Sequence, residues 1–192
     1  MDVARWYYLQ VDGDNEIERG PLLLDQLCEL IRSGQLPEDV LVSLQPTPDP
    51  SSWTGADAVE EILLALPLDR ERLMREYIGY GEAPRGEANW GWASHRMFSM
   101  LRALPEVAWL LIVEMIDRAP SDQSLSFLAA SPLEDLLSDH GPLFIARVEQ
   151  RAVESAQFHR ALGMLRRLGM TDDVWQRVQA AAKSDSGNEH AG

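Results

Sequence analysis

Two carboxylates and an imidazole fall within seven residues of this chain, at Glu134, Asp135 and His140. Residues of these types donate and accept protons, so acid–base catalysis is one hypothesis for the segment. The other interpretation is structural, because a helix dipole favours carboxylates in the first turn and a histidine in the last. The spacing of leucines predicts a short helix over 132–139 that ends at His140-Gly141, which favours the structural role. An acid–base enzyme therefore stays the alternative function.

The residue types and their spacing argue against a metal or cofactor site. The four histidines lack the paired spacing of a metal site, and one cysteine, Cys28, can form neither a disulfide framework nor a cysteine-based metal site. Cys28 lies in an apolar helical pattern, which favours a buried position. The phosphate-loop, dinucleotide and nucleophile-elbow motifs are absent. We therefore expect no metal and no cofactor.

Aromatic residues are the stronger candidates for a binding surface, because large aromatic side chains are enriched where proteins meet their partners. The predicted partner-binding residues are Trp6, Tyr8, Trp53, Trp90 and Trp92. For Trp6 and Trp53 the alternative is a core position that holds a sheet against a helix. For the Trp90-Gly91-Trp92 pair, the alternative is sealing two domains together. The sequence leaves these roles open.

Hydrophobic periodicity predicts an α+β chain with a small sheet-plus-helix module followed by an all-α helical bundle. The module contains predicted strands at 5–11, 16–19 and 40–44, and a helix at 22–33 that stops at Gly34. Further helices are predicted at 55–66, 67–77, 94–104, 105–118, 121–130, 132–139, 142–155, 156–168 and 171–182. The predicted domains are 1–66, a connecting helix and irregular linker at 67–92, a helical domain at 93–183 and a disordered tail at 184–192.

The N-terminal pattern resembles the GYF domain family, and more closely its bacterial second-type variant. The elements in register are Trp6-Tyr7-Tyr8, Gly20-Pro21, the helix at 22–33, Gly34 and Trp53. The resemblance covers residues 4–66 and implies a small sheet with one helix, and peptide binding in a cradle of aromatic side chains. Four cradle positions carry no aromatic ring here, namely Gln10, Leu22, Leu30 and Gln35. The resemblance therefore implies the scaffold and a peptide-binding role, and leaves the ligand open.

The C-terminal half also resembles a known kind of domain. The segment at 130–141, followed by the helices up to residue 182, is similar to an uncharacterised family of bacterial helical domains. The resemblance covers residues 90–182 and implies a fold without an activity.

The charge of the chain is strongly negative and uneven. The formal net charge is −14, and residues 1–70 hold 14 acids and 4 bases. Such a charge argues against binding to nucleic-acid phosphates and to anionic membrane surfaces. The arginines at 147, 151, 160, 166 and 167 form a mild basic patch that could bind an acidic partner, pair with the acidic first domain of the same chain or simply be solvated. An acidic first module suggests a basic or neutral partner, and solubility alone is the other explanation.

Together these features predict a cytoplasmic, non-catalytic protein that acts as an adaptor for a protein or peptide partner. The start of the chain lacks the pattern of a signal peptide, and the longest apolar run is too short to span a membrane. A bacterial immunity or effector-handling protein is one concrete form of this function, by analogy with acidic immunity proteins that block basic toxins. The identity of the partner and the oligomeric state are left open.

Overall fold

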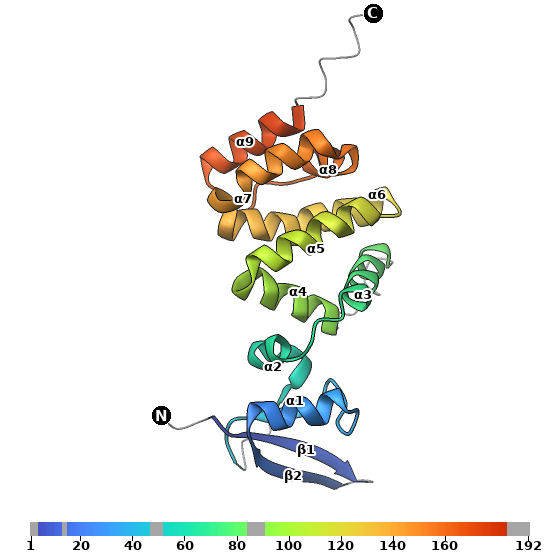
Figure 1. Ribbon diagram of the computed structural model, residues 1–192, viewed down its shortest axis with the longest axis vertical. Helices are drawn as coiled ribbons and strands as arrows, with labels where there is room; N and C mark the ends of the chain where they lie inside the picture. The colour runs from blue at the N-terminus through green and yellow to red at the C-terminus, as the bar shows by residue number, and fades with distance from the viewer. Residues whose placement is uncertain (1–3, 13–14, 47–51, 84–90, 184–192) are drawn as a thin grey trace, which may run out of the picture. The chain divides into compact units, whose positions relative to one another are not determined.

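A computed structural model describes residues 4–12, 15–46, 52–83 and 91–183 (Figure 1). The chain divides into two compact units: unit 1 comprises Met1–Asp69 and Trp90–Ser99, and unit 2 comprises Arg70–Asn89 and Met100–Gly192. A small antiparallel sheet occupies the N-terminal part, and helices make up most of the remaining chain. This confirms the predicted α+β class with a helical C-terminal part.

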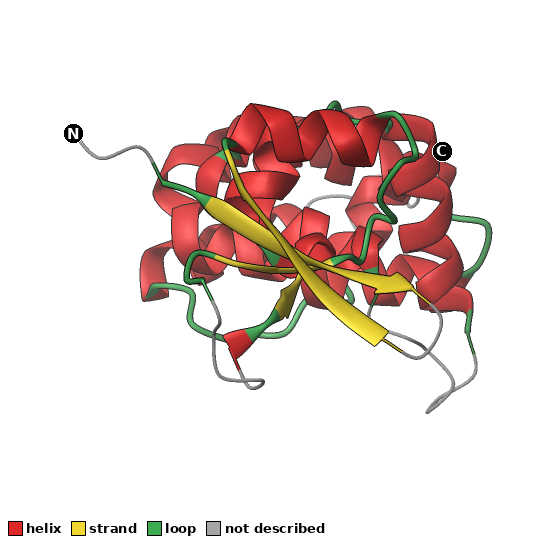
Figure 2. Ribbon diagram, turned by 90° about the horizontal axis from the view of Figure 1, so that it is seen from below, coloured by secondary structure: helices red, strands yellow, loops and turns green. Residues whose placement is uncertain are grey.

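The sheet of unit 1 has four strands in the order β2-β1-β3-β4, drawn in yellow in Figure 2. Their bounds are β1 (Trp6–Asp12), β2 (Asn15–Leu22), β3 (Leu41–Ser43) and β4 (Thr54–Gly55). β2 is longer than the predicted strand at 16–19, because it continues through Gly20-Pro21. Proline, which lacks an N–H group, is tolerated there because β2 is an edge strand. Gly20 has a φ of 129°, and a Cβ at that position would lie 2.7 Å from the carbonyl oxygen of Trp6.

Helix α1 (Leu24–Arg32) covers one face of this sheet and builds the core of unit 1. Its buried side chains Leu27, Cys28 and Ile31 pack with Trp6 and Val42 from the strands. Burial raises the pKa of the Cys28 thiol, in keeping with its predicted buried position. The helix ends as predicted: Gly34 has a φ of 74°, and the backbone N–H groups of residues 35 and 36 both donate to the carbonyl oxygen of residue 30.

The predicted helix at 55–66 is two shorter elements. A 3-10 turn, η2 (Ala56–Ala58), is followed by α2 (Glu60–Ala65), and Val59 is extended between them. Ile62 and Leu63 of α2 are buried. The helix α4 (Trp92–Ala103) begins two residues before the predicted start. Residues 84–90 of the predicted irregular segment, including Trp90, lie outside the described residues.

Helix α3 (Arg70–Glu82) continues through two glycines where the sequence predicts a linker. The prediction is wrong here because Gly81 is buried against another helix, α6 (Asp122–Leu128). A Cβ on Gly81 would lie 2.7 Å from Cδ1 of Phe127. The glycine therefore permits close packing of two helices and does not end one.

The largest difference from prediction is α7 (Glu134–Glu154), one helix of 21 residues where two were expected. It runs through Gly141 and Pro142, although proline inside a helix costs about 3 kcal/mol. Burial offsets this cost, because Leu137, Phe144 and Ile145 on both sides of Pro142 are buried. A π-helical turn, η3 (Ala129–Leu133), connects α6 to α7 and contains Pro132.

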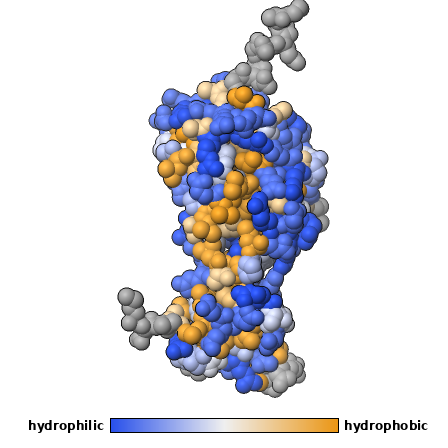
Figure 3. All heavy atoms as spheres, in the orientation of Figure 1, coloured by the Kyte–Doolittle hydropathy of each residue, from blue (hydrophilic) through white to orange (hydrophobic). Residues whose placement is uncertain are grey.

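The remaining helices follow the predicted pattern more closely. They are α5 (Pro105–Arg118), with proline at its first turn, α9 (Asp172–Lys183), and α8 (Ala156–Leu162), which ends six residues before the predicted end at 168. The rings of Phe144 and Phe158 both contact Trp109 of α5, with centroids 5.7 and 5.8 Å away. Figure 3 shows that exposed apolar residues also gather over α5. Within the described residues, no helix is both long and apolar enough to cross a membrane.

Candidate functional site

A hollow of about 410 Å³ lies where β1 ends, beside the loop between α1 and β3. We call it the sheet-end hollow. It is lined by Leu9, Gln10, Val11, Glu16, Gln35, Leu36, Pro37, Asp39, Val40 and Leu41. β1 positions the first three of these residues, the start of β2 positions Glu16, and the loop after the Gly34 turn supplies most of the others. The hollow is therefore a product of three chain segments that the sheet brings together.

The chemistry of the sheet-end hollow is mixed. Val11 is 71% exposed and Leu41 is 40% exposed, so apolar surface faces solvent at this place. Two carboxylates, Glu16 and Asp39, accompany the apolar side chains. An apolar surface with a few polar and charged groups is typical of binding sites for ligands and peptides.

Two amide side chains of the hollow are held by hydrogen bonds. Arg19 Nε donates to Gln10 Oε1 at 3.1 Å, and Gln35 Nε2 donates to Ser33 Oγ at 3.2 Å. Both glutamines are exposed. Their side chains can offer hydrogen bonds to a ligand, whereas neither offers the flat apolar face of an aromatic ring.

Trp6 borders two further hollows of unit 1. The first, of about 440 Å³, is lined by Ala4, Trp6, Leu23, Leu24, Asp25 and Glu61. The second, of about 350 Å³, is lined by Trp6, Val42, Ser43, Leu44, Gln45, Ser52, Thr54 and Val59. Trp6 is 4% exposed and belongs to the core of the unit, so the core role is the one that the structure shows.

The other predicted aromatic residues lie apart from the sheet-end hollow. Tyr8 is partly buried against the core of unit 1, Trp53 is half-buried, and Trp92 is half-buried as the first residue of α4. Trp90 lies outside the described residues. The described aromatic residues of the prediction do not line the sheet-end hollow. Their binding to a partner stays a prediction.

The sequence contained a signal for the sheet-end hollow that the prediction missed. In β1 the side chains of Trp6 and Tyr8 alternate with those of Leu9 and Val11, which therefore extend from the opposite face of the sheet. Apolar residues on both faces of a strand indicate that other groups cover both faces of the sheet. Residues 35–41 could not be assigned to the same place from sequence, because only tertiary folding brings that loop beside β1.

Glu134, Asp135 and His140 all lie on α7, and two of them bind main-chain groups of other segments. Glu134 is 2% exposed and its carboxylate accepts a hydrogen bond from the backbone N–H of Arg166 at 3.3 Å. Burial raises the pKa of Glu134, and desolvation followed by the charge of Asp139 raises the pKa of Asp135. His140 Nε2 donates to the carbonyl oxygen of Leu101 at 3.0 Å.

The structural role predicted for His140, at the last turn of a short helix, is wrong. His140 lies in the interior of α7 and does not interact with the end of its own helix. Because α7 rises about 1.5 Å per residue, the Cα atoms of Glu134 and His140 are about 9 Å apart along its axis. Each of the two side chains thus ties α7 to a different backbone segment. Among the described residues, no group of three or more His, Cys, Asp or Glu side chains could hold a metal ion.

Comparison with known proteins identifies one family. A family of unknown function, DUF6869, matches residues 81–186, which is more than half of the chain. The matched residues include the 130–141 segment on which the resemblance to an uncharacterised helical family is based. No GYF domain is detected in the N-terminal module. No curated protein and no solved structure matches the chain.

Proposed function

The chain belongs to the DUF6869 family of unknown function, and we propose that it is an adaptor that binds an extended segment of a partner protein without catalysis of its own. The observation that carries this proposal is the sheet-end hollow, with solvent-exposed Val11 and Leu41 at a cavity of about 410 Å³. Exposing such side chains to water is unfavourable unless a ligand covers them. A peptide that covered both would remove apolar surface from water.

The resemblance to GYF domains supports the same place as the binding surface. The Gly34-Gln35-Leu36 segment stands at the name-giving motif of that family, and both Gln35 and Leu36 line the hollow. Gln10, at another position of the aromatic cradle, lines it as well. Two of the four cradle positions without an aromatic ring thus lie at the hollow, whereas Leu22 and Leu30 do not line it.

The side chains favour a peptide other than a polyproline segment. Proline rings bind by packing on flat aromatic faces. At this hollow, glutamine amides replace two of those faces, and carboxylates lie beside them. We therefore propose a ligand with apolar side chains and exposed hydrogen-bonding groups, and with neutral or positive charge.

A selection experiment tests this proposal. A random heptapeptide library is displayed and selected on the full chain, and the enriched peptides are then measured against Val11→Asp and Leu41→Asp. Each variant places a charge in the apolar surface, so we expect affinity to fall at least about tenfold. Val153→Asp is the matched control, because Val153 is 83% exposed on α7 in unit 2.

The test depends on which variants lose affinity for the selected peptides. Peptides that lose affinity for both sheet-end variants and keep it for Val153→Asp support the proposal. Peptides that bind Val11→Asp and Leu41→Asp as tightly as the parent chain would place binding elsewhere. A library that yields no enrichment over several rounds would also contradict the adaptor function at this site.

A further inference from the structure

A second hollow of unit 1 has the features of a pocket for a positively charged side chain. We call it the acidic hollow, and its volume is about 440 Å³. It is lined by Ala4, Trp6, Leu23, Leu24, Asp25 and Glu61. It differs from the sheet-end hollow in its residues and lies at the opposite end of β1.

The helices place two carboxylates at this hollow. Asp25 is in the first turn of α1, and Glu61 is in the first turn of α2. Negative charge in a first turn is stabilised by the helix dipole, which explains why these positions are acidic. It does not explain why the two first turns lie at one apolar cavity. Both carboxylates are exposed, so a ligand can reach them.

The remaining walls are apolar. Trp6, Leu23 and Leu24 line the same hollow as the carboxylates. Arginine and lysine side chains combine a long apolar stem with a cationic head, so that the stem packs on apolar surface while the head stays near water or a carboxylate. An apolar wall beside two carboxylates matches both parts of such a side chain.

The charge of unit 1 agrees with a cationic occupant. The unit contains 14 acids and 4 arginines. Three of the arginines have partners away from the acidic hollow, since Arg19 binds Gln10, Arg32 pairs with Glu29, and Arg96 donates to the carbonyl oxygen of Leu66. The excess of acid is therefore complementary to a basic partner.

We propose that the acidic hollow binds an arginine or lysine side chain of a partner polypeptide, with its stem on the half-buried Leu23 and Leu24 and its cationic head between Asp25 and Glu61. This deepens the proposed adaptor function, on which it rests for the polypeptide nature of the ligand. It assigns the partner a basic residue that is bound separately from the segment in the sheet-end hollow.

Isolated side-chain analogues test the hollow directly. The ¹⁵N-labelled full chain is titrated with N-acetyl-arginine amide and N-acetyl-lysine amide, with the neutral N-acetyl-norleucine amide as a probe of similar length. We expect saturable shifts of the Trp6 indole and Leu24 amide signals with the two cationic probes. The norleucine probe is expected to bind at least about fivefold more weakly, because it lacks the ion pairs.

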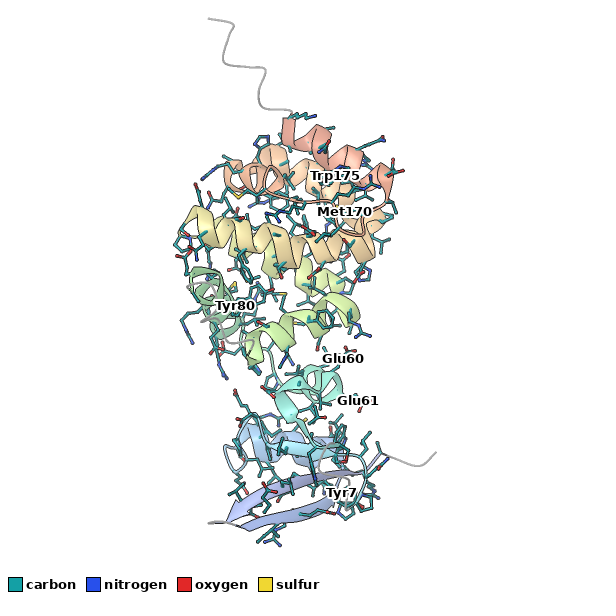
Figure 4. All side chains as sticks on the ribbon, turned by 180° about the vertical axis from the view of Figure 1, so that it is seen from behind. Tyr7, Glu60, Glu61, Tyr80, Met170 and Trp175 are labelled. Atoms are coloured by element: carbon teal, nitrogen blue, oxygen red, sulfur yellow. The ribbon has the colours of Figure 1, made fainter. Side chains whose placement is uncertain are left out.

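Two neighbouring glutamates supply a matched pair of variants. Glu61 lines the hollow, while Glu60 occupies the same first turn of α2 and is not among its lining residues (Figure 4). Glu61→Gln and Glu60→Gln remove the same charge from the same helix end. We expect Glu61→Gln to weaken binding of the arginine probe about fivefold and Glu60→Gln to leave it nearly unchanged.

The results separate this inference from the proposed function. If Glu60→Gln and Glu61→Gln weakened binding of the arginine probe equally, the probe would be attracted by the general negative charge of the surface. That result would overturn the proposed pocket. Equal binding of the norleucine probe would also overturn it. Val11→Asp is expected to leave the arginine shifts unchanged, so loss of peptide binding at the sheet-end hollow does not affect this outcome.

Discussion

The two units of this chain differ in how their charges are balanced. Unit 1 contains 14 acids and 4 bases, whereas unit 2 contains 17 acids and 13 bases. In unit 2 the arginines form ion pairs between helices, such as Arg177 with Glu149 and Arg118 with Glu71. Unit 1 has too few bases to neutralise its acids in this way. Its excess of negative charge is therefore not neutralised by bases of the same unit.

The basic patch predicted on the last helices illustrates this difference. Four of its five arginines pair with acids inside unit 2, namely Arg147 with Glu106, Arg151 with Asp117, Arg160 with Asp122 and Arg167 with Asp172. Pairing with the acidic first domain was one of the roles that the sequence left open, and these four partners lie instead in unit 2 itself.

The units differ in packing as well. The sheet-end hollow, the acidic hollow and the third hollow beside Trp6 belong to unit 1, while unit 2 contains helix pairs so close that a glycine Cβ would collide with a neighbour. The hollows on which the proposals rest thus lie in unit 1, and the close contacts between helices lie in unit 2. Variants of unit 2 test that contrast, from the largest expected effect to the smallest.

Adjacent residues of α7 measure the packing of unit 2. Phe144 is 1% exposed and contacts Trp109, whereas Leu143 is 72% exposed. Phe144→Ala is expected to lower the free energy of unfolding by about 3–5 kcal/mol, because it removes a buried ring and leaves a cavity. Leu143→Ala is expected to change it by less than about 0.5 kcal/mol. Urea denaturation followed by circular dichroism measures both, and similar losses would contradict the assigned faces of α7.

Two helical glycines provide a second test of close packing. A Cβ on Gly141 would lie 2.9 Å from both Cγ atoms of Val174, whereas nothing lies within 4 Å of a Cβ on Gly79. We expect Gly141→Ala to destabilise the protein by about 1–2 kcal/mol, since α9 must move away from α7. Gly79→Ala is expected to stabilise it by about 0.5–1 kcal/mol, because alanine favours helix. Thermal unfolding shows the two signs, and stabilisation by both would refute the close contact.

The smallest expected effect on stability comes from the buried carboxylate of Glu134 in unit 2. Burial raises the pKa of Glu134, so the folded state holds its proton to higher pH than the unfolded state. The stability from this group is complete below its unfolded pKa and is lost as pH rises through the folded pKa. Glu134→Gln keeps an acceptor for the Arg166 N–H and removes the titration. We expect its stability relative to the parent to increase from about pH 4 to about pH 7.

A surface variant of the same helix controls for net charge. Glu154→Gln removes an equal charge from α7, where Glu154 is solvent-exposed. Unfolding curves at several pH values are compared for the parent chain and both variants. A stability difference for Glu134→Gln that falls toward neutral pH would show that the carboxylate is better stabilised when charged.

Prediction from sequence succeeded where local chemistry decides the structure. The strand at Trp6–Asp12, the helix that opens with Pro105 and the stop at Gly34 were all anticipated. Prediction failed at Gly81 and at Gly141-Pro142. Glycine and proline usually end a helix when no tertiary contacts oppose this local preference. In both places a neighbouring helix or a long buried face offsets the local preference.

The candidate sites divide in the same way. Gln10 and Gln35, two positions of the GYF resemblance, line the sheet-end hollow, whereas the aromatic residues chosen as binding residues lie in or near the core of unit 1 or outside that hollow. Leu9 and Val11 were recognisable only as strand residues. Their exposure depends on which face of the sheet α1 covers, and composition cannot decide this.

The sequence by itself determined the α+β class, the negative charge of the first module, the buried cysteine and the end of α1 at Gly34, because each depends on residues close together in the chain. Only the tertiary structure decided that Asp25 and Glu61 meet at one cavity, that residues 9–11 and 35–41 form another, and that α7 is continuous. These features join segments far apart in sequence. Side-chain packing places such segments side by side, and it depends on the shapes of all the elements at once.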